Sequence, residues 1–152
     1  MKAAIGIDKN NNLLRIINKP NRYISRFIIE EAMKKPGDIL DNIIMTKSLN
    51  ELQEKDITQL KNSLLRIRDM TTSEAVKFIR YFVGYEEYVR DYAYAKSIDY
   101  IFFKELLEEI SSSVKEFPTI QDYIAHVDKI VNSTESRLKK DKNIDAVSLI
   151  TM

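Results

Sequence analysis

Residues 71–84, TTSEAVKFIRYFVG, contain both the start and the end of one helix. Thr71 and Glu74 stand three residues apart, the spacing of a capping box, in which each side chain accepts a hydrogen bond from the other residue's backbone N–H. Gly84 suits the position that follows a helix, because glycine adopts the left-handed conformation without a steric penalty. The stretch therefore predicts a helix over Ser73–Val83.

The rest of the chain has few breaks, with only 3 Gly and 3 Pro in total. This favours long helices with few tight turns. Proline pushes the preceding residue out of the helical region, so Pro20 ends a first helix, and Asp38 is a suitable N-cap for a later one. Five further helices are predicted over about residues 12–18, 25–35, 39–45, 86–95 and 98–115. Another helix carries the apolar residues Ile57, Leu60, Leu64 and Ile67 and ends before Thr71. The last predicted helix begins at Thr119 with Asp122.

Apolar residues at helical spacing indicate which faces of these helices are buried. In the second helix they are Phe27, Ile28, Ala32 and Met33, and in the last helix they are Ile120, Tyr123, Ile124, Val127, Ile130 and Val131. The sequence therefore predicts an all-α fold, a multi-helix accessory domain.

The C-terminal stretch AVSLITM, residues 146–152, breaks the helical pattern. It is apolar and rich in β-branched residues, which is typical of a buried strand. No second strand is predicted upstream, so this orphan strand is expected to pair within a neighbouring domain that the chain lacks. Residues Lys2–Ile7 resemble the tail of a helix that began earlier. The predicted organisation is a truncated helix and connector over 1–12, a helical domain over 13–140, and a connector and returning strand over 141–152.

Composition excludes several classes of protein. The hydrophobic fraction of 44% and the charged fraction of 31% are those of a folded domain, and 24 Lys+Arg balance 23 Asp+Glu. Without cysteine, disulfides and the usual zinc sites are excluded. No stretch approaches the roughly 20 apolar residues of a membrane span. We therefore expect no membrane partner and a cytoplasmic location.

Two segments carry a resemblance to a known family. Residues 13–25, LLRIINKPNRYIS, resemble the opening of the 2B subdomain of UvrD/PcrA/Rep-like superfamily 1 ATP-dependent DNA helicases. Residues 147–152, VSLITM, resemble the strand that leads into a conserved helicase motif on the second RecA-like domain. Between them, Thr72–Ala95 and the helix at Thr119 follow in the order expected of 2B. The resemblance spans essentially the whole chain.

The resemblance implies a parent enzyme that couples ATP hydrolysis to 3′–5′ translocation and duplex unwinding, in DNA repair or replication. It also implies that the 2B subdomain is mobile, contacts duplex DNA and tunes the motor. The two RecA-like motor domains of the same parent chain would bind ATP and Mg²⁺. We expect no catalytic residue, cofactor or metal site in this chain, and the most tempting Lys-Ser pair, Lys47-Ser48, lacks the preceding glycines of a phosphate-binding loop.

The best candidate site is a connector that precedes a helix start near Ser25. A helix N-terminus offers unpaired N–H donors and the positive end of the helix dipole, and both attract phosphate. The family's Gly-Ile-Gly turn, which touches the duplex backbone, corresponds here to Tyr23-Ile24-Ser25, with both glycines replaced. The alternative is a plain helix–helix turn with exposed charges. The predicted DNA-backbone contacts are Lys19, Arg22, Tyr23, Ile24, Ser25 and Arg26, with Arg137, Lys139, Lys140 and Lys142 as a weaker group that better fits a hinge edge.

Other candidate residues have simpler structural explanations. The only histidine, His126, has no second histidine or cysteine with which to bind a metal. The glutamate pairs 30–31, 86–87 and 108–109 fit solvated helix faces better than acid–base catalysis. The tyrosines at 81, 85, 88, 92 and 94 fit an aromatic-lined helix better than a base-stacking surface. A helical protein–protein interaction module without nucleic-acid binding remains the alternative function.

Overall fold

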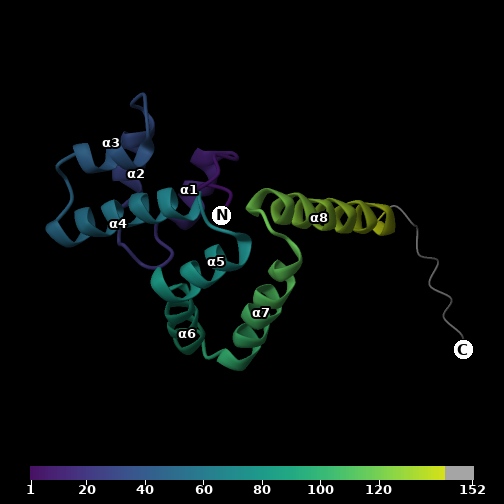
Figure 1. Cartoon of the computed structure of the whole chain (residues 1–152). Helices are drawn as coiled ribbons and strands as arrows, with labels where there is room; N and C mark the ends of the chain where they lie inside the picture. Colours follow the sequence, from purple (N-terminus) through teal and green to yellow (C-terminus); the bar gives the residue numbers. More distant parts are fainter. Residues whose placement is uncertain (143–152) are drawn as a thin grey trace, which may run out of the picture.

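The computed structural model describes residues 1–142, with side chains as far as residue 136. All regular elements within these residues are helical (Figure 1), which confirms the all-α prediction for this part of the chain. The predicted strand at 146–152 lies outside the described residues. The elements are α1 (Lys9–Ile16), α2 (Arg26–Met33), α3 (Ile39–Met45), α4 (Glu51–Ile67), α5 (Thr72–Lys77), the π-helix η1 (Phe78–Phe82), α6 (Tyr85–Ala95), α7 (Tyr100–Ser113), the 3-10 helix η2 (Val114–Glu116) and α8 (Ile120–Lys142).

Polar side chains cap several helix starts, and the caps predicted at Asp38 and at Thr71 with Glu74 are confirmed. The Asp38 carboxylate accepts hydrogen bonds from the first backbone N–H groups of α3. Thr71 and Glu74 form the reciprocal capping box of α5, and a second box of this kind, Asn50 with Gln53, opens α4. These interactions satisfy N–H groups that have no partner inside the helix.

The helix predicted over 73–83 is interrupted. Its α-helical part ends at Lys77, and η1 continues it as a π-helix that buries the Arg80 side chain. Gly84 then takes a left-handed backbone with φ 78°. The polar partners of Arg80 come from α6 and α7. The change from α-helix to π-helix therefore coincides with tertiary contacts of Arg80.

The N-terminal prediction also needs correction. Residues 2–7 form turns instead of a helix, with the Ile7 N–H donating to the Lys2 carbonyl oxygen. The first helix begins at Lys9 because Asp8, with φ 39°, has left-handed backbone geometry. The buried Ala3 and Ala4 nevertheless join the core, so this turned segment packs against the helical domain.

The main core lies among α1 to α5 and the start of α8. The predicted apolar face of α4 is buried, with Ile57 fully inaccessible. In α2 only part of the predicted face is buried: Ile28 and Ala32 are inside, whereas Phe27 and Met33 are exposed. The core residues are Ala3, Ala4, Leu13, Ile17, Ile24, Ile28, Ala32, Ile39, Leu40, Ile43, Ile57, Leu60, Leu64, Ile67, Ala75, Ile120 and Ile124.

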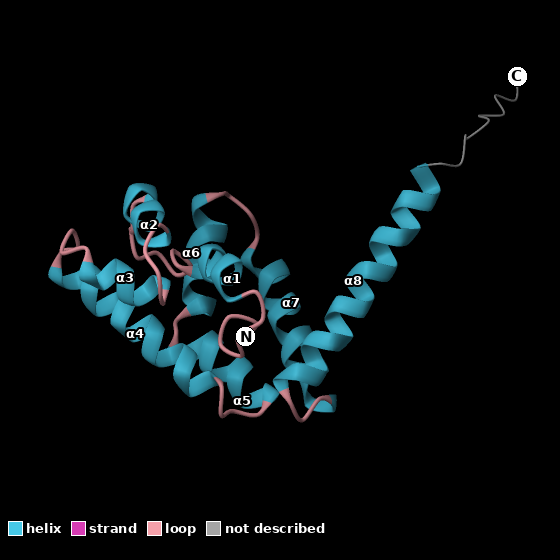
Figure 2. Cartoon of the chain, turned by 90° about the horizontal axis from the view of Figure 1, so that it is seen from above, coloured by secondary structure: helices cyan, strands magenta, loops and turns pink. Residues whose placement is uncertain are grey.

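The last helix, α8, runs beyond the packed helices. Figures 1 and 2 show it projecting away from the other helices, with only its beginning near them. Ile120 and Ile124 are buried, whereas Ile130 and Val131 are 51% and 47% exposed. The predicted inward face is therefore confirmed only at its start, because the second half of α8 has no neighbouring helix to cover it within the described residues.

Helices α6 and α7 form a hairpin with many exposed apolar side chains. Tyr85, Tyr88 and Tyr92 follow one another along α6 with ring centroids 5.8 and 6.5 Å apart, and Tyr92 meets Phe103 of α7 edge to face. An exposed row continues over the loop and α7 at intervals of four residues, made of Ile98, Phe102, Leu106 and Ile110. Within residues 1–142, no helix combines the length and apolar character needed to cross a membrane.

Candidate nucleic-acid interface

Positive charge is concentrated at the beginning of the chain. Residues 1–26 contain six Lys or Arg side chains and a single acidic one, Asp8, although the whole chain has a net charge of only +1. The remaining residues are therefore net negative. This segment comprises the N-terminal turns, α1, and the connector to α2, which we define as residues 17–25. A local positive field of this kind attracts polyanions even when the whole chain is nearly neutral.

The connector is held by hydrogen bonds from two side chains. The Asn18 amide donates to the Ile24 carbonyl and accepts from the Ile24 N–H, both at 2.9 Å. The Gln53 amide of α4 donates to the Tyr23 carbonyl at 2.7 Å. Ile24 is consequently buried, while Tyr23, with φ 54°, forms a tip that is 79% exposed. The connector thus has a defined shape with a tyrosine at its outermost point.

Arg22 does not lie on the surface as the sequence analysis assumed. Its side chain is buried, and Nη1 donates to the carbonyl oxygens of Ile16, Ile17 and Pro20 at 3.1–3.2 Å. Burial lowers the Arg22 pKa, an effect that the nearby Asp56 carboxylate opposes. The guanidinium therefore caps the carbonyl end of α1, and the predicted phosphate contact through Arg22 is corrected to a structural role.

The start of α2 is where the sequence predicts it. Ser25 is the N-cap, and its hydroxyl accepts from the Ile28 N–H at 3.3 Å, so it serves the helix. The first intrahelical bond runs from the Ile29 N–H to the Ser25 carbonyl. The N–H groups of Arg26 and Phe27 precede it and have no intrahelical acceptor. These two donors are the ones that α2 can offer to an anion.

The predicted site residues separate into an exposed and a buried set. Lys19, Tyr23, Ser25 and Arg26 are exposed, whereas Arg22 and Ile24 are buried. The Arg26 side chain is 92% exposed and pairs with Glu30 one turn along α2, at 2.7 Å. A phosphate would compete with that carboxylate for the same guanidinium. The structure thus brings two exposed cations, Lys19 and Arg26, to the two ends of the connector.

Arg15 also belongs to this basic surface, although sequence reasoning missed it. It precedes Lys19 by four residues, and both side chains line the same hollow beside α1. Neither forms an ion pair with any residue whose side chain the structure describes. The spacing of four residues was the available signal, although α1 ends at Ile16 and Lys19 lies in the connector.

Comparison of the chain with protein-family profiles, curated protein sequences and solved structures gives no match.

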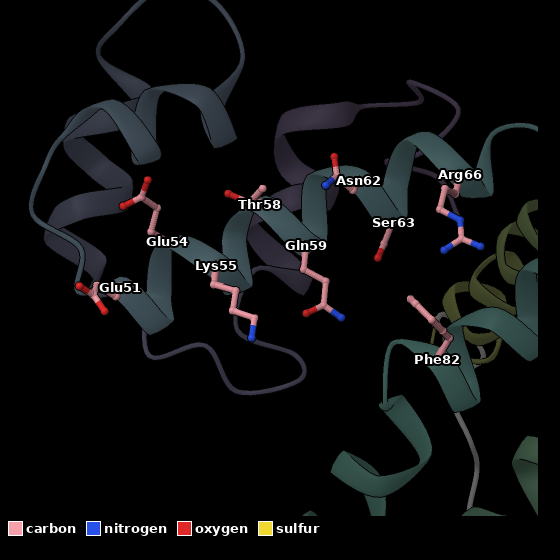
Figure 3. Close-up of a pocket in the computed structure, with 9 residues that line it drawn as sticks. All are labelled: Glu51, Glu54, Lys55, Thr58, Gln59, Asn62, Ser63, Arg66 and Phe82. Atoms are coloured by element: carbon pink, nitrogen blue, oxygen red, sulfur yellow. The ribbon is translucent and has the colours of Figure 1, made fainter.

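A hollow of about 630 Å³ forms a groove along α4. Figure 3 shows Lys55, Gln59 and Arg66 along this helix, with Phe82 of η1 facing them. The Arg66 guanidinium lies 4.8 Å and 5.2 Å from the ring centroids of Phe78 and Phe82. Because Glu51 and Glu54 also line the groove, it presents both signs of charge and selects neither anions nor cations.

A polar network around the buried Arg80, which sequence analysis did not predict, joins η1, α6 and α7. Arg80 Nη2 lies 2.7 Å from the Glu86 carboxylate and 2.9 Å from that of Glu108, while Nη1 donates to Ser111 Oγ at 2.6 Å. Burial opposes the charged form of Arg80, but the two carboxylates raise its pKa overall. Glu86 also accepts from the Tyr100 hydroxyl at 3.2 Å. These groups are saturated by one another, which favours a structural role.

The remaining candidates fit their structural interpretations. The His126 ring lies 4.7 Å from the Phe117 ring on the exposed side of α8. Among the described residues, no group of three or more acidic or histidine side chains is placed to hold a metal ion. Glu30, Glu31 and Glu87 pair with basic residues three or four positions away, as expected of solvated helix faces. The weaker basic group at 137–142 lies beyond the described side chains.

Proposed function

We propose that the chain is a 2B-like accessory subdomain of an ATP-dependent 3′–5′ DNA helicase, which acts in the cytoplasm in DNA repair or replication. In this role it contacts the backbone of duplex DNA and modulates unwinding. The resemblance of residues 13–25 and 147–152 supports the family, and the all-helical architecture agrees with it. The observation that carries DNA contact is the basic N-terminal segment, with exposed Lys19 in the connector and exposed Arg26 beside the first N–H groups of α2.

The proposed contact uses phosphate and leaves the bases unread. Arg26 and the first N–H groups of α2 form one phosphate seat, in which the helix dipole adds to the side-chain charge. Lys19 provides a second cation in the connector, and the exposed Tyr23 stands between the two cations in the sequence. Few phosphates are neutralised, so we expect a dissociation constant of roughly 10⁻⁴–10⁻⁶ M or weaker, independent of sequence and sensitive to salt.

Fluorescence anisotropy with a labelled duplex tests this proposal. The double variant Lys19→Ala/Arg26→Ala should bind more weakly and should shallow the dependence of log K on log salt by about two units, since about 0.9 unit accompanies each phosphate contact. Lys34→Ala/Lys35→Ala is the matched control, because it also removes two exposed cations, one of them paired with a glutamate. Equal binding by the two double variants would refute the assigned surface.

In the proposed parent, the RecA-like motor domains bind ATP and Mg²⁺ and are the chain's second partner. The present chain should then show no saturable heat when titrated with nucleotide in a calorimeter. Nucleotide binding in the micromolar range would contradict the assignment of the ATP site to the motor domains.

A helical protein–protein interaction module is the second candidate, and one observation favours it. The exposed row Ile98, Phe102, Leu106 and Ile110 is the kind of apolar surface that marks protein contacts. If this row pairs two copies of the chain, sedimentation should show a dimer that Phe102→Asp/Leu106→Asp dissociates. Such a dimer in a chain with no affinity for duplex DNA would make the interaction module the better assignment.

A further inference from the structure

A hollow of about 290 Å³ lies between the N-terminal turns, α1 and α6. Its size is at the small end of the range, about 300–1,000 Å³, that is typical of ligand sites. Arg15, Lys19 and Lys2 contribute cations, and Tyr85 contributes an aromatic ring. The other lining residues are Met1, Ala3, Asn12 and Ile16.

The charge of this hollow distinguishes it from the others. No carboxylate lines it, whereas four other surface hollows each include at least one aspartate or glutamate. Lys2 is partly neutralised by Asp128, 2.5 Å away, but Arg15 and Lys19 have no ion-pair partner within the described side chains. Two unpaired cations that line the same hollow, Arg15 on α1 and Lys19 in the connector, can both bind one phosphate.

The position of these cations near the carbonyl end of α1 has an alternative explanation, in which they offset the negative end of the helix dipole. Arg22 already performs that task, because its Nη1 donates to the carbonyls of Ile16, Ile17 and Pro20. Arg15 and Lys19 are therefore available for an external anion.

Tyr85 provides the second half of a nucleotide site. Burial raises the Tyr85 pKa, so the phenol stays neutral near neutral pH and does not repel a phosphate. The ring begins a series that continues through Tyr88 and the exposed Tyr92, with centroid separations of 5.8 and 6.5 Å. A cationic seat at one end of an aromatic series is the arrangement with which proteins bind single strands.

We propose that this hollow binds one nucleotide of single-stranded DNA, with its phosphate on Arg15 and Lys19 and its base against Tyr85. A duplex does not fit this site, because its bases are paired and stacked and cannot meet an aromatic ring. The inference deepens the proposed function, since it places an unpaired strand on the same basic segment that faces the duplex backbone.

Anisotropy with two probes, a labelled oligo-deoxythymidylate and a blunt duplex, tests the proposal on the full chain. Tyr85→Leu should weaken binding of the single strand about fivefold or more, the effect of losing one base–aromatic stack, and should leave duplex binding unchanged. Arg15→Ala should weaken single-strand binding and shallow its salt slope by about 0.7 unit. Tyr94→Leu is the control, because Tyr94 is 89% exposed and lies outside the stacked series.

Tyr85→Phe separates loss of stacking from loss of folding, because it keeps the ring and should bind the single strand as the wild type does. Circular dichroism melting establishes that each variant is folded. Single-strand binding unaffected by Tyr85→Leu and Arg15→Ala would overturn this inference and leave the duplex proposal standing. If Arg26→Ala leaves duplex binding unaffected while Tyr85→Leu reduces single-strand binding, the duplex contact is refuted and the single-strand site stands.

Discussion

Replacing Arg22 by alanine tests whether this arginine holds the connector or faces DNA. Arg22 as a whole is 7% exposed, and its guanidinium lies at the end of α1. Its Nη1 contacts three carbonyl oxygens, those of Ile16, Ile17 and Pro20, at 3.2, 3.1 and 3.1 Å. Arg22→Ala removes this donor and leaves the carbonyls without it. We therefore expect a large loss of stability from a residue that sequence analysis assigned to the surface.

The expected loss follows from the hydrogen bonds. Nη1 carries two hydrogens, so its three contacts amount to about two bonds, and hydrogen bonds to a charged group contribute about 1.5–3 kcal/mol each. The long distances favour the lower value, which gives about 3 kcal/mol. Loss of packing by the arginine stem adds to this cost, whereas removal of a buried charge offsets part of it. We expect a decrease of about 3 kcal/mol in the free energy of unfolding.

Urea unfolding measured by circular dichroism checks this value. Arg26→Ala is the comparison, because it removes an exposed arginine whose single ion pair with Glu30 contributes roughly 0.3–0.5 kcal/mol. Arg22→Lys should fall between Arg22→Ala and the wild type, since one ammonium cannot reach all three carbonyls. A loss below about 1 kcal/mol for Arg22→Ala would refute the structural assignment and return Arg22 to the list of phosphate ligands.

Three further predictions concern the network, the capping box and the connector. Arg80→Met should lower the free energy of unfolding by about 2–3 kcal/mol in urea titrations, because it strands the partly buried Glu86 carboxylate. Hydrogen bonds from the Thr71 N–H and hydroxyl lower the Glu74 pKa, so the associated stabilisation is present above the ordinary glutamate pKa and disappears as the pH falls. Thermal melts should therefore show a smaller loss of stability between about pH 5 and 3 for Glu74→Gln than for the wild type. Asn18→Ala should weaken duplex binding severalfold in anisotropy without changing the salt slope, because it loosens the connector but removes no cation.

The helix starts could be predicted from sequence because their hydrogen bonds are local. The partners in each pair, Thr71 with Glu74 and Thr119 with Asp122, are three residues apart, so each pair can be recognised from the sequence. Asp38 caps α3 over two and three residues in the same manner. A local interaction of this kind requires no knowledge of the rest of the fold.

The buried arginines could not be recognised in the same way. Arg80 stands in a stretch with good helical spacing, and its partners Glu108 and Ser111 lie about thirty residues further along the chain. No sequence pattern around Arg80 predicts the π-helix in which it lies. Arg22 was closer to being predictable, because a cation just after a helix can satisfy its last carbonyls. The same position also fits a phosphate ligand, and sequence alone does not decide between the two.

The exposed half of α8 shows that apolar spacing alone does not predict burial. Ile130 and Val131 continue the apolar spacing of Ile120 and Ile124, so periodicity predicts one continuous buried face. Whether such a face is covered depends on the length of the neighbouring helices. The spacing of apolar residues in α8 carries no information on that length. Here the neighbouring helices cover only the start of α8, and Ile130 and Val131 are exposed.

Tyr23 and Ser25 stand where the proposed family has glycine, and the hydrogen bonds of the connector bear on that difference. Tyr23 has φ 54°, a left-handed geometry that glycine adopts freely and that costs other residues about 1–2 kcal/mol. Gln53 and Asn18 hold the peptide group that follows this residue, through the Tyr23 carbonyl and the Ile24 N–H, so these bonds offset the cost. A connector fixed in this way loses little conformational freedom on binding. Under the proposed function, the departure from glycine therefore changes which group meets the DNA, a tyrosine ring instead of bare backbone, without requiring a flexible turn.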